Sequence, residues 1–158
     1  MSSRPWRNGT AGRGQDPDHI SYRTSPGSFG RVQIMAALFI ETIEFRQAEG
    51  NATRIDLGGV QFSFAPPGPP PVSLTPHLVV LVSCGPDEPG NAALIVEFKD
   101  AAGNEVARSL QPFQVEPGKF GYRLVRAELT WEAPGTISAH CRLNDGPITV
   151  VPLTMLAS

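Results

Sequence analysis

The chain has 158 residues, 41% of them apolar, and a formal net charge of −2. This length predicts one domain with enough apolar side chains to build a core. The sequence contains neither a run of eighteen apolar residues nor an apolar signal core near its start, so we expect no membrane span and no secretion. The expected location is the cytoplasm, where two cysteines stay free rather than forming a disulfide framework.

Charge is divided unevenly along the chain. Residues 1–31 carry a net charge of +3, whereas residues 32–158 carry eight basic and thirteen acidic side chains, a net charge of −5. An acidic body argues against nucleic acid as a partner, because phosphate contacts need clustered lysine and arginine. Residues 1–31 lack periodicity and are predicted to be a disordered basic tail. Alternatively, the tail contacts an acidic partner, or translation starts near Val32 or Met35 and the tail is not part of the native protein.

From residue 32 onward, turn signals recur every eight to twelve residues. They are EGN (49–51), the proline run (66–71), GPDEPGN (85–91), DAAGN (100–104), EPGK (116–119), APG (133–135) and NDG (144–146). The segments between them are short and rich in Val, Ile, Leu, Phe and Thr. This pattern predicts an all-β fold, a single antiparallel β-sandwich of about seven to nine strands over residues 32–158.

Alternating polarity predicts which side chains face the core. Every second residue is apolar in GVQFSF (59–64), VRAELTWE (125–132) and TISAHCRL (136–143), so each is predicted to be a strand with one buried face. By contrast, HLVVLV (77–82) and ALIVEF (93–98) are more evenly apolar, which is typical of central strands.

One strand shows a phase slip. Phe120, Tyr122 and Leu124 are even-numbered, but the apolar face from Val125 onward is odd-numbered. One extra residue in a strand reverses the facing of everything that follows it, so the slip predicts a β-bulge near residues 124–125.

The segment at residues 34–50 is ambiguous between strand and helix. Its Ala, Met, Leu and Glu residues favour a helix, and Gly50 could cap it. The surrounding turn signals favour a strand instead, and residues 52–59 then form the returning arm of a hairpin. A second phase slip follows Ile40, after which Ile43 and Phe45 continue the apolar face.

The chain resembles a bacterial family of small β-sandwich domains of unknown function, immunoglobulin-like in general appearance. The segments that carry the resemblance are ALFIETIEF (37–45), GNATRIDLGGV (50–60), PHLVVLV (76–82), VEFKDAAGNEV (96–106) and APGTISAHCRLNDGP (133–147). The resemblance implies a strand over Met35–Phe45. The resemblance implies no catalytic or ligand-binding residue, because the shared motifs form turns rather than catalytic or binding sites.

The sequence predicts no catalytic, cofactor or metal residues. Cys141 and His140 are adjacent, so in a strand their side chains point to opposite faces and cannot form a dyad. Cys84 could be exposed and reactive beside a Gly-Pro turn, although its neighbours are acidic. The acidic segments DPDHI (16–20) and PDEPGN (86–91) lack the ligand spacing of a metal loop.

Four charged residues form the candidate contact surface. Arg126 and Glu128 lie on the exposed face of one predicted strand, and His140 and Arg142 lie on that of another. If these strands pair, the side chains form one charged patch. Cross-strand ion pairs that keep a sheet soluble explain the same residues equally well.

Without a catalytic constellation, the leading hypothesis is a non-catalytic protein-interaction or binding module with an unknown protein partner, and not an enzyme. One alternative is a small-molecule or carbohydrate-binding domain that stacks its ligand on Trp131, Tyr122 or Phe120. Another is a homo-oligomeric structural subunit that associates through the edge strand GVQFSF. The proline run APPGPPPV (65–72) is predicted to be a stiff link between strands rather than a docking peptide.

Overall fold

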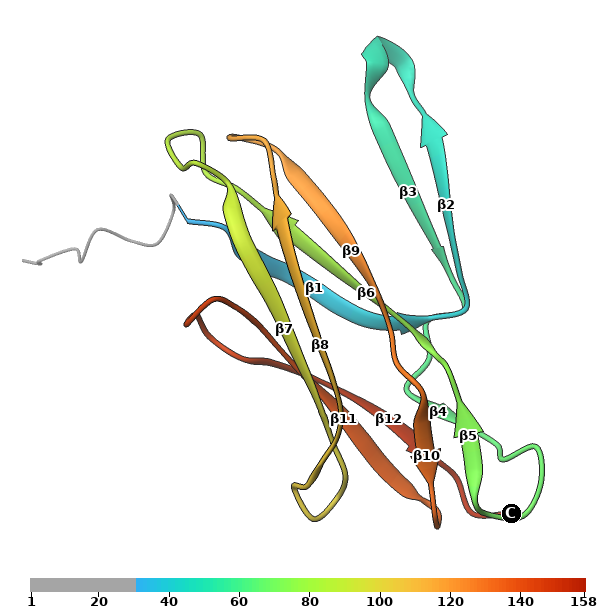
Figure 1. Cartoon of the computed structure of the whole chain (residues 1–158). Coiled ribbons are helices and arrows are strands. Elements are labelled where there is room, and N and C mark those ends of the chain that lie inside the picture. The colour runs from blue at the N-terminus through green and yellow to red at the C-terminus, as the bar shows by residue number, and fades with distance from the viewer. Residues whose placement is uncertain (1–30) are drawn as a thin grey trace, which may run out of the picture.

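A computed structural model describes residues 31–158, which form an all-β fold without an α-helix (Figure 1). The twelve strands are β1 (Gln33–Ile40), β2 (Thr42–Gln47), β3 (Thr53–Gly58), β4 (Ser63–Phe64), β5 (Val72–Leu74), β6 (His77–Ser83), β7 (Asn91–Lys99), β8 (Glu105–Gln114), β9 (Phe120–Arg126), β10 (Leu129–Trp131), β11 (Gly135–Leu143) and β12 (Thr149–Met155). The all-β prediction is confirmed. Apart from Arg31, the predicted basic tail lies outside the described residues.

Hydrogen bonding sorts the strands into four sheets. Their strand orders are β1-β6-β9, β4-β12-β11-β7-β8, β10-β5 and β2-β3. All pairs are antiparallel except β4 with β12, which are parallel. The described residues thus contain more strands than the seven to nine expected, since β4, β5 and β10 are segments of only two or three residues.

The common core lies between the three-stranded and the five-stranded sheets. Phe39 and Leu78 enter it from the first sheet, and Phe98 enters it from the second. The alternation predicted for residues 136–143 is confirmed, because every second side chain of that segment is buried. HLVVLV is β6, the central strand of its sheet, as its even apolarity predicted.

Strand β9 alternates without interruption, so the bulge predicted near residues 124–125 is wrong. All seven residues of β9 pair with β6 in a continuous register. Val125 faces the common core, so Phe120, Tyr122 and Leu124 project from the opposite, outer face of the sheet. The phase slip therefore reflects two different faces: Phe120, Tyr122 and Leu124 make the outer face of β9 apolar, and Val125 begins a core-facing set that continues with Leu129 and Trp131 in β10.

The strand prediction for residues 34–50 is confirmed. The phase slip after Ile40 marks the point where the chain passes from one sheet to another. The chain leaves the three-stranded sheet at Glu41 and enters β2, which pairs with β3 as the expected hairpin. Ile43, Phe45 and Ile55 share one face of this hairpin. The Phe45 ring lies 4.9 Å from that of Tyr122, so this face is turned toward β9.

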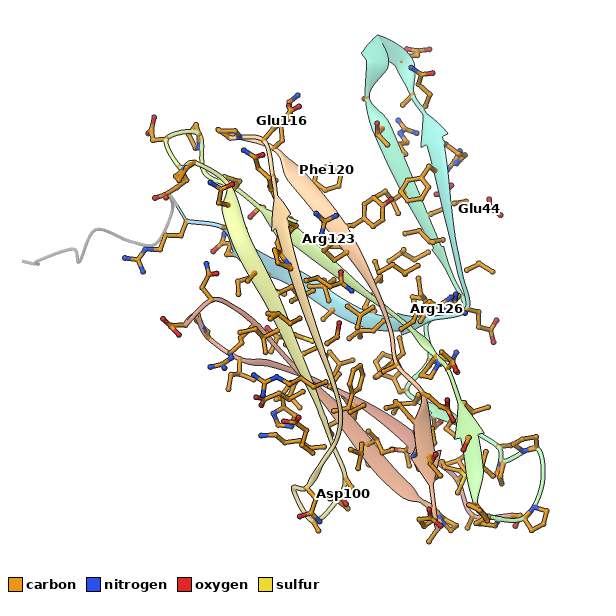
Figure 2. All side chains as sticks on the ribbon, viewed as in Figure 1. Glu44, Asp100, Glu116, Phe120, Arg123 and Arg126 are labelled. Carbon is orange, nitrogen blue, oxygen red and sulfur yellow. The ribbon has the colours of Figure 1, made fainter. Side chains whose placement is uncertain are left out.

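The outer face of the three-stranded sheet is covered in part. Ile40 and Val79 are only 1% and 0% exposed, although neither belongs to the common core. The register places both on the outer face, in the same cross-strand rows as His77 and Leu124. Side chains of the hairpin β2-β3 and of β9 extend toward one another, and Phe45 contacts Tyr122, so the hairpin covers part of this face (Figure 2).

The segment around the proline run differs from its prediction. Only Ser63–Phe64 of GVQFSF is a strand, and Val60 and Phe62 are exposed rather than buried. The Gln61 backbone amide donates instead to the carbonyl oxygen of Phe39 at 2.9 Å, in an isolated antiparallel bridge to β1. The proline run then links β4 of one sheet to β5 of another, the position predicted for it.

We expect Ile40→Ala to lower the free energy of unfolding by about 2–5 kcal/mol, because it opens a cavity under the hairpin. The matched control is Leu110→Ala, at a side chain that is 61% exposed on β8. Its effect should stay within about 0.5 kcal/mol. Urea unfolding followed by circular dichroism measures both values, and equal small effects would contradict a covered outer face.

Candidate functional site

The four charged residues expected to form a contact surface lie on different sheets. Arg126 ends β9, which pairs with β6, and Glu128 lies in the short link to β10. His140 and Arg142 lie in β11, which pairs with β7 and β12. The strand pairing that would unite them is not observed, since β9 and β11 belong to sheets on opposite sides of the common core.

The charged face of the five-stranded sheet is built from ion pairs. His140 lies opposite Glu97 in the register, and the Glu97 carboxylate is 3.3 Å from Arg108 and 3.5 Å from Lys99. Exposed pairs of this kind contribute about 0–1 kcal/mol each. Their arrangement explains a soluble sheet surface without requiring a ligand.

The buried thiols have little chemical reactivity. Cys141 is in the common core, where burial raises the pKa of its thiol to about 12, so it stays protonated at neutral pH. The exposure considered for Cys84 is wrong: its side chain is buried, and its Sγ donates to the Gly85 carbonyl at 3.4 Å.

Other predicted chemistry can be placed briefly. Within residues 31–158, no group of three or more His, Cys, Asp or Glu residues could hold a metal ion. No helix in this part of the chain is long and apolar enough to cross a bilayer. The segment at residues 16–20 lies outside the described residues.

Of the three aromatic residues considered for ligand stacking, two are accessible. Trp131 is 3% exposed and packs edge to face on Phe64, with ring centroids 5.0 Å apart. Phe120 and Tyr122 are 52% and 39% exposed. Of these three side chains, only Phe120 and Tyr122, on the outer face of β9, are therefore accessible to a ligand.

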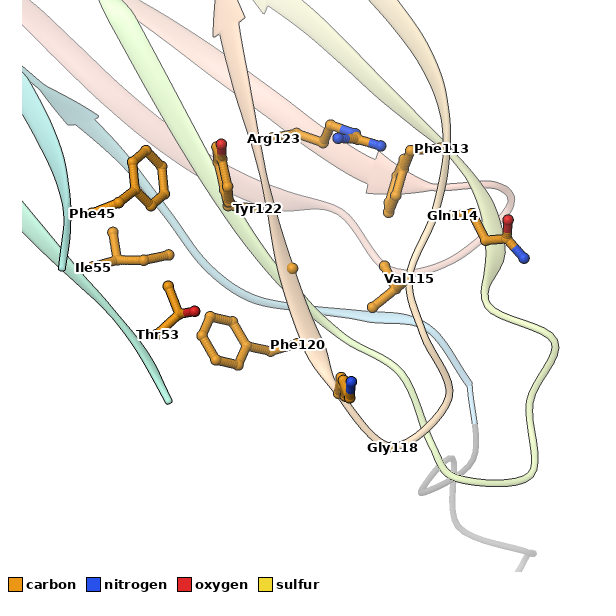
Figure 3. A pocket seen from close by; sticks show the side chains of 12 residues that line it. Phe45, Thr53, Ile55, Phe113, Gln114, Val115, Gly118, Phe120, Tyr122 and Arg123 are labelled. Carbon is orange, nitrogen blue, oxygen red and sulfur yellow. The ribbon is translucent and has the colours of Figure 1, made fainter. Parts of the chain in front are cut away.

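A groove of about 640 Å³ borders β9 (Figure 3). The hairpin, the end of β8, the following turn and β9 itself form its walls. The lining residues are Phe45, Thr53, Ile55, Phe113, Gln114, Val115, Gly118, Lys119, Phe120, Gly121, Tyr122 and Arg123. Because successive side chains of β9 point to opposite faces, the groove includes surfaces on both sides of this strand.

The outer side of the groove is aromatic. Phe45 from β2 and Tyr122 from β9 face each other, and Phe120 lies beyond them near Thr53 (Figure 3). Phe45 is 49% exposed despite its contact with Tyr122. The hairpin thus holds these rings side by side without burying them, which leaves an apolar surface open to a partner.

The inner side of the groove combines one aromatic ring with a cation. The Arg123 guanidinium lies over the Phe113 ring, 4.6 Å from its centroid. Nearby, the Gln111 side-chain amide donates to the carbonyl oxygen of Leu124 at 3.4 Å. These contacts connect the edge of the five-stranded sheet to the edge of the three-stranded one.

The groove is basic within an acidic chain. Its lining includes Lys119 and Arg123 but no carboxylate, although residues 32–158 carry a net charge of −5. Lys119 is paired with Glu116, and this hydrogen bond lowers the pKa of the Glu116 carboxyl. No carboxylate of the described residues lies within 4.0 Å of Arg123, so its charge has no partner there.

Comparison with protein-family models and with curated proteins finds no match for the chain. The resemblance to a bacterial β-sandwich family therefore stays a prediction. The groove itself was not predicted. Its signal in the sequence was the phase slip at β9, which reads equally well as a bulge or as a strand that is apolar on both faces.

We expect iodoacetamide to leave Cys84 and Cys141 unmodified in the native protein, because burial keeps both thiols from the reagent. Both should react in concentrated urea, which is the internal control. Intact mass spectrometry counts the adducts. Rapid labelling of either cysteine under native conditions would show that the core around it is open.

Proposed function

We propose that the chain is a non-catalytic, protein-binding β-sandwich module that holds an apolar segment of another protein in the groove beside β9. One observation carries the proposal: Phe45, Phe120 and Tyr122 form an exposed aromatic cluster next to the edge of a sheet. Exposed apolar clusters are uncommon on monomers and often mark binding sites. Tyrosine and phenylalanine are also enriched in protein interfaces.

The sandwich description is supported by the common core. Side chains from the three-stranded and five-stranded sheets pack into it from opposite sides. A rigid core of this kind holds the strands that border the groove, while the hairpin adds a wall to it. Free, buried cysteines are consistent with a reducing compartment, so we propose a cytoplasmic location for the module.

The groove favours a protein ligand over the alternatives considered. A carbohydrate platform would lose Trp131, whose side chain is buried, and keep only Phe120 and Tyr122, two rings that share the groove with the apolar side chains of Phe45 and Ile55. The edge strand suggested for self-association, β4, is only two residues long and offers few backbone groups for pairing. The groove beside β9, in contrast, has a volume of about 640 Å³ and three exposed aromatic side chains.

Selection of random displayed peptides on the immobilised protein tests this function. We expect peptides with apolar side chains to be enriched, and Phe120→Ala to weaken their binding by about tenfold, a typical loss when an interface aromatic is truncated. Leu110→Ala, at an exposed apolar side chain of β8 that does not line the groove, should change nothing. Thermal melting confirms that both variants fold.

Two results would contradict the proposal. In the first, no peptide is enriched on the wild-type protein. In the second, the enriched peptides bind the Phe120→Ala and Leu110→Ala variants equally well, which would place their site elsewhere.

A further inference from the structure

We propose that the partner binds as an extended strand that pairs with the free edge of β9 and places a carboxylate beside Arg123. This inference rests on the proposed function and specifies its ligand. It combines the direction of the backbone groups of β9 with the charge of the groove.

The backbone of β9 has a free edge. Within residues 31–158 the strand pairs with β6 alone. The Leu124 carbonyl accepts a hydrogen bond from Gln111 of the opposite sheet, so this carbonyl points away from β6. In an antiparallel strand the N–H and C=O of one residue point to the same side, and alternate residues share that side. Phe120 and Tyr122 therefore present their backbone groups to the free edge, as Leu124 does.

A second hydrogen bond supports the same orientation of the β9 backbone groups. The Cys84 amide donates to the carbonyl oxygen of Lys119 at 2.9 Å. The odd-numbered residues therefore point toward β6, which leaves the even-numbered ones for another strand. Among hydrogen bonds of the described residues, only the one from Gln111 reaches this edge of β9.

The groove fits the alternating side chains of an added strand. One side chain of such a strand lies over the outer surface of Phe45 and Tyr122, and the next lies over the inner surface of Phe113 and Arg123. Strand addition of this kind obtains affinity from backbone hydrogen bonds and specificity from alternate side-chain sites. Both sets of sites are present beside one edge.

Charge selects the occupant. Strand β9 carries Arg123 and Arg126 and no carboxylate, so a second copy of the chain paired on the same edge would bring two positively charged strands together. The chain's own residues 1–30 hold four arginines and two aspartates and have the same sign. An acidic segment of another protein is complementary, since opposite charges across paired strands are stabilising.

Arg123 also has a simpler explanation, and the experiment must distinguish it from the proposal. An inward-pointing charge on an edge strand is a common device that prevents pairing with other chains. Under that explanation Arg123 repels every added strand. Under the proposal it selects acidic ones.

The backbone is tested with two variants at Tyr122. Proline removes the amide that faces the free edge and leaves the hydrogen bonds to β6, which come from odd-numbered residues. Threonine removes the same ring but keeps the amide, so it is the matched control. For the tightest peptide from the selection, we expect Tyr122→Pro to bind about tenfold more weakly than Tyr122→Thr in fluorescence anisotropy.

N-methylated peptides test the same pairing without altering the protein. Methylation of every second amide removes either the donors that face β9 or those that face solvent. We expect the peptide methylated at the amides that face β9 to lose binding, and the peptide methylated at the solvent-facing amides to keep it. Equal effects of the two methylations, or equal binding by the two Tyr122 variants, would overturn strand addition while the proposed protein-binding function stands.

The carboxylate is tested by a double-mutant cycle. We expect the selected peptides to contain Asp or Glu, and exchange of that residue for its amide should weaken binding about fivefold in the wild-type protein but not in Arg123→Gln. Arg108→Gln, at an exposed arginine of β8 that does not line the groove, is the control for a general change in charge. Selection of basic or uncharged peptides would overturn the acidic ligand, and selection of none would overturn the proposed function with it.

Discussion

The three-stranded sheet β1-β6-β9 is apolar on both faces, and the arrangement of the surrounding strands follows from this. Val125, Leu78 and Phe39 face the common core, while Leu124, Val79 and Ile40 face outward. Apolar side chains on an outer face need a cover, because leaving them in water costs free energy in proportion to their area. The hairpin β2-β3 supplies that cover immediately after β1, by leaving the sheet at Glu41 and folding over it.

The cover is incomplete at the start of β9, and the candidate site lies there. Phe120 and Tyr122 remain exposed beside Phe45, while one edge of the same strand pairs with no other strand of the described residues. An exposed edge next to aromatic side chains is an aggregation hazard unless something limits what can pair with it. Arg123 meets that requirement in either of its two roles, by repelling all strands or by admitting acidic ones.

Local features were predictable from the sequence, and long-range ones were not. Turn chemistry located the strand junctions, and period-two alternation gave the buried face of β11, because both depend on neighbouring residues. The bulge assigned to residues 124–125 was wrong, since alternation cannot show which face is buried when both are apolar. The charged patch expected of Arg126, Glu128, His140 and Arg142 does not form either, because β9 and β11 lie in different sheets, and strand order depends on contacts between distant segments.

Hydrogen exchange of individual β9 amides, followed by NMR, tests the account most directly. In the free protein we expect the amides of Phe120, Tyr122 and Leu124 to exchange much faster than those of Gly121, Arg123 and Val125, which bond to β6. A selected acidic peptide should slow the first set and leave the second unchanged. Equal protection of all six amides in the free protein, or fast exchange of the first set in the complex, would contradict a free edge that serves as the binding site.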